Sequence, residues 1–184
     1  MKIVKEKNLG QGKQLRLWEK YFMTDAGKEV VWELVERKNI YGKGAAVVIA
    51  QTKEKEIILE RNWRFPIGSF VIQFPAGLTD REGESEEETA RRELLEETGY
   101  QAEILIPIIT TPLSPALTST RATHFFAPQA EYIGGERKDI AEEIEVLKIP
   151  VEKLEDFLLN LPENTELDLR VPGIIWILEK KNLI

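Results

Sequence analysis

One twenty-residue segment, REGESEEETARRELLEETGY at positions 81–100, constrains the fold of this chain more than any other. Ser85 followed three residues later by Glu88 forms a capping box, which begins a helix, and Gly99 is a typical residue for ending one. The sequence therefore predicts a helix between these positions. Eight of the twenty residues are glutamates, a density that a solvated surface helix does not need.

Three of these glutamates lie on one side of the predicted helix. Because an α-helix turns by about 100° per residue, Glu93, Glu96 and Glu97 fall within an arc of about 100°. Carboxylates on one arc repel each other unless a cation lies among them, and hard cations such as Mg²⁺ or Mn²⁺ prefer oxygen ligands. The alternative is a solvated helix face balanced by Arg91 and Arg92, and the spacing alone does not decide between the two.

Strand patterns surround this helix. Residues 15–36 read as two strands around the turn TDAGK, and AAVVIAQ and EIILERNW form a second hairpin around TKEK. Further strands are expected in SFVIQFPAG, which Pro75 and Gly77 stop, and in AEILIPIIT, ATHFFAPQ and EIEVLKIP; helices are expected in VEKLEDFLLN and PGIIWILEKKNL. This order predicts a mixed α/β protein, with a small N-terminal antiparallel strand domain at residues 1–42 and the main domain at residues 43–184.

Composition and charge exclude several classes of protein. The chain has 184 residues, enough for one domain, and 42% of them are hydrophobic, enough for a core. No apolar run approaches the ~18 residues of a transmembrane helix, so we expect no membrane association. The net charge of −7 argues against a nucleic-acid partner, although bound cations would allow an anionic substrate. The absence of cysteine and of a signal peptide favours a cytoplasmic location.

The acidic segment resembles a known signature. Gly77, Glu84 and the run RELLEETGY resemble the motif of the Nudix hydrolases, which is a glycine, a glutamate, then Arg-Glu-apolar-x-Glu-Glu-x-Gly-apolar. Six residues separate Gly77 from Glu84 where the motif has five. The resemblance implies the Nudix fold, in which a mixed β-sheet lies between helices. It also implies hydrolysis of a nucleoside diphosphate linked to another group, with divalent cations as cofactors.

Within that motif the resemblance assigns roles residue by residue. It implies that Glu93 and Glu97 are metal ligands and that Glu96 is a further metal ligand or an acid beside them. It also implies that Arg92 orients a glutamate rather than touching the substrate. These assignments are chemically sensible, because cations neutralise diphosphate oxygens and lower the pKa of an attacking water.

The resemblance extends beyond the motif. WELVERK, ERNWRFPIGSFVIQFPAGLTD and AEEIEVLKIP resemble the ADP-ribose pyrophosphatase branch, from about Leu15 to Leu154. This branch implies Mg²⁺- or Mn²⁺-dependent cleavage of ADP-ribose or a related ADP-sugar to AMP and a sugar phosphate. It also implies a homodimer that exchanges its N-terminal strand domains.

The same branch implies a set of residues around the substrate. Trp32 would stack on the adenine, with Glu33 and Arg37 at the rim of that pocket. Arg64 would contact the adenosine or a phosphate, because a guanidinium binds phosphate in a bidentate manner. The Ala76 carbonyl would complete the metal shell, and Leu78 and Ser114 would touch the substrate. Glu142, or alternatively Glu143, would bind metal or activate the water.

One departure from the branch leaves the sugar open. Pro115 and Ala116 stand where this branch often has Pro-Gly, and alanine lacks the freedom of glycine at positive φ. The alternatives are the same reaction on another nucleoside diphosphate sugar, such as GDP-mannose, and a non-catalytic ADP-ribose sensor. The intact set of Glu93, Glu96 and Glu97 weighs against the sensor, which needs no complete set.

Overall fold

The computed structural model describes residues 1–136 and 143–184. The chain begins with β1 (Lys2–Gln11), β2 (Leu15–Met23) and β3 (Glu29–Arg37). There follow β4 (Gly44–Thr52), β5 (Glu56–Arg64), β6 (Ser69–Gln73), β7 (Ala76–Leu78) and α1 (Glu86–Thr98). The remainder comprises β8 (Tyr100–Gln101), β9 (Ile106–Pro112), β10 (Arg121–Tyr132), β11 (Ile144–Pro150), a 3₁₀ turn (Val151–Lys153), α2 (Leu154–Leu159), β12 (Thr165–Leu167) and α3 (Arg170–Lys180).

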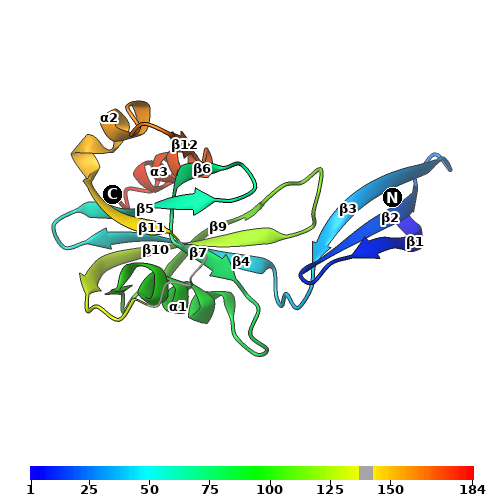
Figure 1. The fold of residues 1–184 in the computed structure, drawn as a ribbon, viewed down its shortest axis with the longest axis horizontal. Helices are drawn as coiled ribbons and strands as arrows, with labels where there is room; N and C mark the ends of the chain where they lie inside the picture. The colour runs from blue at the N-terminus through cyan, green and yellow to red at the C-terminus, as the bar shows by residue number, and fades with distance from the viewer. Residues whose placement is uncertain (137–142) are drawn as a thin grey trace.

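A mixed sheet forms the centre of the molecule. Within the described residues it has nine strands, with the path β12-β6-β5-β4-β10-β8 and with β11, β7 and β9 paired to β5, β4 and β10. The β4–β10 and β12–β6 pairs are parallel and the others antiparallel. Figure 1 shows α1 on one side of this sheet and α2 and α3 on the other.

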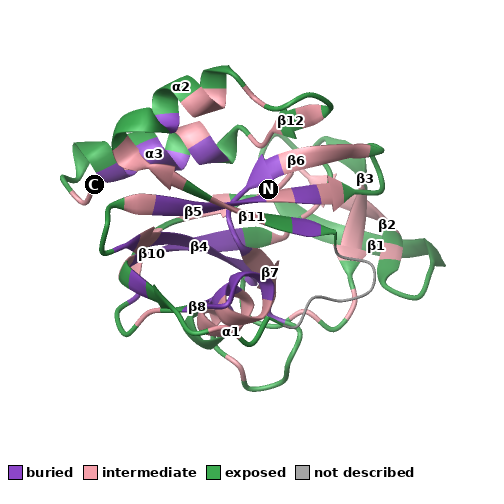
Figure 2. Ribbon diagram, turned by 60° about the vertical axis from the view of Figure 1, so that its left-hand side comes forward, coloured by how far each residue is buried: buried purple, intermediate pink, exposed green. Residues whose placement is uncertain are grey.

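Alternate residues of β4 enter two different hydrophobic clusters, because successive side chains of a strand point to opposite faces. Ala45, Val47 and Ile49 pack in one cluster together with α3 side chains, including Val171, Ile174 and Leu178. Ala46, Val48 and Ala50 pack in the other cluster together with Ala90 and Leu94 of α1. The buried central strands in Figure 2 therefore lie between two helical layers, which confirms the predicted sheet between helices.

The sheet divides where the strands β4 and β5 part. These two strands share one paired position, Gln51 with Ile57. Farther along, β5 pairs with β6 whereas β4 pairs with β7, so the continuous segment from β6 to β7 passes from one half of the sheet to the other. The segment changes partner at Phe74 and Pro75, and the Pro75 carbonyl accepts a hydrogen bond from the Val48 N–H. This division opens the sheet next to α1.

The three N-terminal strands form a separate antiparallel sheet that projects from the body of the molecule in Figure 1. It meets the body at the loop between β9 and β10. The Val35 N–H donates to the Leu117 carbonyl at 2.8 Å, and the Trp32 indole N–H donates to the Ala116 carbonyl at 2.9 Å. The loop with the unusual Pro115–Ala116 sequence is therefore the support of this sheet.

Several expected elements differ from the structure. The predicted stop at Gly77 is wrong, because Gly77 lies inside β7 and pairs with Ala46. The strand expected from residue 102 begins only at Ile106, and the last helix begins two residues before Pro172. The sequence predicts no strand at the positions of β1, β8 and β12. Among the described residues, no helix is both long and apolar enough to cross a membrane.

Candidate active site

The helix α1 carries the acidic residues, and its ends are fixed as the sequence predicts. The Ser85 hydroxyl accepts from the Glu88 N–H while the Glu88 carboxylate accepts from the Ser85 N–H, and Gly99 ends the helix in the left-handed conformation. Leu94, only 1% exposed, packs on the sheet. Glu97 follows it by three residues and lies on the same side, so the packing of α1 also buries Glu97, which is 5% exposed.

Arg92 holds the other acidic side chains of this region. Its guanidinium forms a two-pronged ion pair with Glu84, at 2.9 and 3.1 Å, and both side chains are 13% exposed. The Nη1 atom of Arg92 lies 2.6 Å from Oε1 of Glu93 and 3.1 Å from Oε2 of Glu96, and it donates to both. The hydrogen bonds from Arg92 hold the pKa of Glu84 below its usual value. Arg92 thus fixes the positions of three carboxylates without lining the adjacent cleft.

The backbone of β7 approaches α1 closely. The Ala76 N–H donates to Oε2 of Glu97 at 2.9 Å. A Cβ atom on Gly77 would lie only 1.8 Å from Oε1 of Glu93 and 2.0 Å from its Cδ. Gly77 is therefore required here because a side chain would occupy the space of the Glu93 carboxylate.

Glu97 is in an environment that disfavours its charge. Burial, together with the nearby carboxylates of Glu60 and Glu93, raises its pKa well above the usual range of a glutamate, and the hydrogen bond from the Ala76 N–H opposes this only in part. A positive charge at this position would reverse the effect. The donor set of Glu93, Glu97 and the Ala76 carbonyl suits a hard divalent cation.

The acidic groups do not yet surround one point. In the described part of the chain, no three acidic side chains or histidines are arranged to hold a metal ion. The reason is visible in their contacts, since Arg92 binds Glu93 and Glu96 while Glu97 accepts from the backbone of β7. To bind a cation, the Glu93 carboxylate would have to leave Arg92. The two hydrogen bonds from Arg92 to Glu84 would meanwhile keep the arginine in position.

A cleft of about 720 Å³ opens beside these carboxylates. Six of the residues that the sequence analysis placed at the site line it: Arg37, Arg64, Ala76, Leu78, Glu93 and Glu97. The lining described for this cleft does not include Trp32, Glu33, Glu96, Ser114 or Glu143. Glu96 instead binds Arg81 and Arg92, and the Ser114 carbonyl accepts from the N–H groups of Leu117 and Thr118. Glu142 lies outside the described residues.

The structure also brings residues to this cleft that were not anticipated. Gln73 lies beneath Arg64 and accepts from its Nε at 2.9 Å. Asp168, between β12 and α3, and Arg170, the first residue of α3, reach the cleft and form an ion pair. Burial disfavours the charged form of Asp168, but hydrogen bonds from Arg170 outweigh it and lower the pKa of the carboxyl. No motif marks these residues, since strands distant in sequence bring them together.

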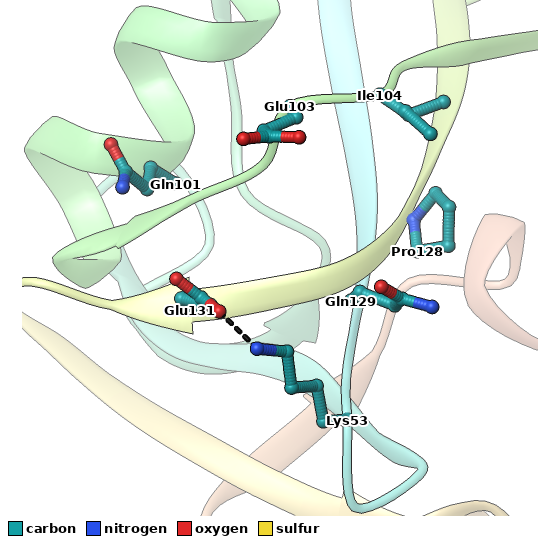
Figure 3. Close-up of a pocket in the computed structure, with 7 residues that line it drawn as sticks. All are labelled: Lys53, Gln101, Glu103, Ile104, Pro128, Gln129 and Glu131. Carbon is teal, nitrogen blue, oxygen red and sulfur yellow. Dashed lines mark hydrogen bonds and ion pairs between the residues drawn. The ribbon is translucent and has the colours of Figure 1, made fainter.

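A second cavity, of about 350 Å³, follows the far end of β4. Figure 3 shows its lining, in which Lys53 points toward Glu131 and forms an ion pair with it. The lining is otherwise made of Gln101, Glu103, Ile104, Pro128 and Gln129. It contains neither an arginine nor any acidic residue of α1. We therefore place the chemistry in the larger cleft.

Comparisons with known proteins agree with this geometry. A family model described as the NUDIX domain matches residues 40–168. The ADP-ribose pyrophosphatase of Bacillus subtilis is 30% identical over 192 residues, which cover 100% of this chain and 98% of that protein. The ADP-sugar pyrophosphatase of Mus musculus is 36% identical over 108 residues, and this match covers 55% of this chain but only 49% of the mouse protein.

Two further relatives extend the comparison. The GDP-mannose pyrophosphatase of Salmonella typhimurium is 32% identical over 143 residues, which cover 71% of each chain. Among solved structures, an ADP compounds hydrolase superposes with a TM-score of 0.80 at 20% identity, over 98% of this chain and 92% of that one. At that identity the likeness concerns the fold.

The close approach at Gly77 predicts a specific defect. The substitution Gly77→Ala should displace the Glu93 carboxylate rather than unfold the protein, because the atoms in the way belong to the end of a flexible side chain. We expect Mn²⁺ affinity to fall about tenfold or more, while the melting temperature changes little. Gly173→Ala is the matched control, since nothing lies within 4 Å of its added Cβ. Unchanged Mn²⁺ affinity in Gly77→Ala would contradict the assignment of Glu93.

The raised pKa of Glu97 predicts how the metal-free protein responds to pH. The folded state retains this proton at pH values where the unfolded chain, with the ordinary value of 4.5, has lost it. The free energy of unfolding in EDTA should therefore decrease as the pH rises above about 4.5. Glu97→Gln should flatten this dependence in urea titrations at several pH values. An equal slope in the two proteins would count against the burial of this charge.

Proposed function

This chain belongs to the Nudix family, and on that premise we propose that it hydrolyses the diphosphate bond of ADP-ribose or a related ADP-sugar, giving AMP and a sugar phosphate. The observation that carries the proposal is the cleft in which the carboxylates of Glu93 and Glu97 face the same space as the guanidinium of Arg64. A site that joins metal-binding carboxylates to an arginine suits a substrate with two phosphates. The names of the pyrophosphatases of Bacillus subtilis and Mus musculus support the ADP-sugar class.

The residues in and beside the cleft would have three different roles in the reaction: metal binding, substrate binding and orientation of the metal ligands. Glu93, Glu97 and the Ala76 carbonyl would hold Mg²⁺ or Mn²⁺, which supplies charge neutralisation at the diphosphate and an acidified water. Arg64 binds the substrate, and the hydrogen bond to Gln73 limits the freedom of its guanidinium. Arg92 remains on Glu84 and keeps Glu93 and Glu96 oriented.

A base must come from outside the acidic segment, because glutamates bound to cations accept protons poorly. We assign this role to Glu142 or Glu143. The backbone carbonyl of Glu143 accepts from the Trp63 N–H at the end of β5, which ties this segment to the strand that carries Arg64. Glu142 itself lies outside the described residues.

We also propose that the protein is a homodimer in which residues 1–42 reach the neighbouring subunit. The N-terminal sheet exposes apolar side chains on both of its faces. By strand register, Leu17 and Val31 lie on one face and Val30 and Trp32 on the other, and all four are 39–49% exposed. A three-stranded sheet with two open apolar faces needs a partner on at least one of them. Trp32 would then stack on the base, with Glu33, which points to the opposite face of β3, at the rim of the pocket. The enzyme would work in the cytoplasm.

Two alternative functions compare with this one as follows. The similarity to GDP-mannose pyrophosphatase favours a second candidate substrate class, since an aromatic residue stacks on either purine. The non-catalytic sensor is the weaker alternative. The buried Glu97 costs stability in the metal-free protein, and a sensor gains nothing from that cost.

The substitution Glu97→Gln tests the reaction. Loss of this ligand removes several kcal/mol of charge stabilisation, so kcat on ADP-ribose should fall by about two to three orders of magnitude. In EDTA the melting temperature should stay level or rise. Glu87→Gln is the matched control, because Glu87 lies on the same helix but pairs with Arg91 at the surface. GDP-mannose, assayed in parallel, decides between the two substrate classes, and near-normal turnover of Glu97→Gln would refute the metal assignment.

Mixed dimers test the exchange of strands. Chains carrying Trp32→Ala and chains carrying Glu97→Gln are co-expressed with different tags and assayed below KM. If each site combines Glu97 of one subunit with Trp32 of the other, half of the dimers are mixed and each has one intact site, so the mixture should recover about one quarter of wild-type activity.

The control is a mixture in which both tagged chains carry Glu97→Gln. Activity that stays at the level of the single variants, with mixed dimers demonstrated by native mass spectrometry, would place Trp32 in the site of its own subunit. A monomer with full activity would refute the dimer altogether.

A further inference from the structure

The strand β5 buries a carboxyl group in an apolar stretch. Glu60 is 0% exposed and directly follows Ile57, Ile58 and Leu59, which are also fully buried. Moving a charged or polar group into such surroundings costs several kcal/mol unless hydrogen-bonding partners compensate for the lost water. The contacts of Glu60 are therefore the features that can compensate for its burial.

On one side, Glu60 is joined to the arginine of the cleft. Gln73 lies opposite Glu60 on β6, and its Nε2 donates to Oε2 of Glu60 at 3.3 Å. The Oε1 atom of Gln73 accepts from Nε of Arg64 at 2.9 Å. Because a guanidinium can only donate, the amide of Gln73 has one orientation, with its oxygen toward Arg64 and its nitrogen toward Glu60.

On the other side, Glu60 is joined to the acidic helix. The carboxyl groups of Glu60 and Glu97 lie close enough to hydrogen-bond when one of them carries the proton. Glu97 in turn accepts from the Ala76 N–H at 2.9 Å. Arg64, Gln73, Glu60 and Glu97 thus form one continuous chain of hydrogen bonds. Glu60 and Arg64 can both take part because they are four residues apart on β5 and point to the same face.

We propose that Glu60 is a positioning residue for the hydrolysis, which fixes the side chain of Glu97 beside β7 and links it through Gln73 to Arg64. This inference rests on the proposed function, in which Glu97 binds the cation and Arg64 the substrate. Side chains that hydrogen-bond a metal ligand fix its orientation, and their loss weakens metal binding about 10- to 100-fold. The chain of bonds passes through the division between β4 and β5, so it also connects the two halves of the sheet.

Two substitutions separate a positioning role from a merely structural one. In Glu60→Gln the new amide can accept from Gln73 and donate to Glu97, so the chain of hydrogen bonds stays complete. In Glu60→Leu both bonds are lost, although the buried volume stays similar. A residue needed only to fill space would give the opposite order, since leucine suits an apolar core.

The readout is the binding of Mn²⁺ alone, followed by electron paramagnetic resonance without nucleotide. We expect Glu60→Gln to bind Mn²⁺ within about threefold of wild type and Glu60→Leu to bind it about 10- to 100-fold more weakly. Melting temperatures in EDTA show whether each variant is folded. Wild-type Mn²⁺ affinity in folded Glu60→Leu, or equal losses in both variants, would overturn the proposal.

Gln73→Met provides a second test that does not touch Glu60, and it decides the matter if Glu60→Leu does not fold. It should raise KM for ADP-ribose several-fold with a smaller change in kcat, because Arg64 loses its support. Wild-type KM together with wild-type Mn²⁺ affinity would refute the link to Arg64.

The experiment also separates this inference from the proposed function. If Mn²⁺ binding follows the expected order but wild-type protein leaves ADP-ribose intact, the substrate is wrong and the positioning role stands. If wild-type protein cleaves ADP-ribose while Glu60→Leu binds Mn²⁺ normally, the positioning role fails alone. A wild-type protein without affinity for Mn²⁺ would overturn both.

Discussion

The packing of α1 against the central sheet is the contact on which the candidate site depends. Ala90 and Leu94 anchor the helix to the face of β4. Because Glu97 lies one turn beyond Leu94 on the same side, the contact that stabilises the helix also carries a carboxylate into the interior. Gly77 allows β7 to approach α1 closely, since any larger residue would collide with Glu93. The contact between α1 and the sheet therefore both stabilises the fold and sets the positions of Glu93 and Glu97.

Electrostatics explain how an acidic protein can accept an anionic substrate. The chain carries a net charge of −7, and its densest acidic segment borders the cleft. Arg92 offsets part of this charge internally, because it is paired with Glu84, Glu93 and Glu96. Arg37 and Arg64 supply positive charge within the cleft itself, whereas Arg170 is paired with Asp168. Divalent cations at Glu93 and Glu97 would complete the change of sign that a diphosphate requires.

The sequence predicts the elements whose signals are local. The capping box and Gly99 define α1 within a residue. The strands β2 and β3 are found from their alternation around TDAGK, whereas β4 and β5 are found as apolar runs on either side of the charged turn TKEK. By contrast, β1 has the mixed polar sequence KIVKEKNLGQ and is exposed along its whole length, so no hydrophobic alternation marks it. Gly77 looked like a strand stop, but the close approach of Glu93 explains it better.

The residues of the candidate site also differ in whether a local sequence signal marks them. Glu93 and Glu97, which the motif resemblance singles out, do line the cleft, because the motif lies within one helix. Glu60 and Gln73 are thirteen residues apart and meet only through the register of β5 and β6, which no spacing rule in the sequence reveals. A glutamate directly after the apolar run Ile57–Leu59, buried within the same strand, is nevertheless an anomaly of the structure.

That anomaly has a physical explanation in the divided sheet. Where β4 and β5 separate, backbone pairing no longer connects the two halves directly, and the segment from β6 to β7 must serve both. Arg64 and Gln73 belong to the half built on β5, whereas Ala76 belongs to the half built on β4. Glu60 and Glu97 join these halves through side chains, at the point where the backbone does not. Hydrogen bonds among buried side chains rigidify their surroundings. Burying Glu60 costs stability. In return, Glu60 connects Arg64 to the acidic helix α1, which would otherwise be joined only through the segment from β6 to β7.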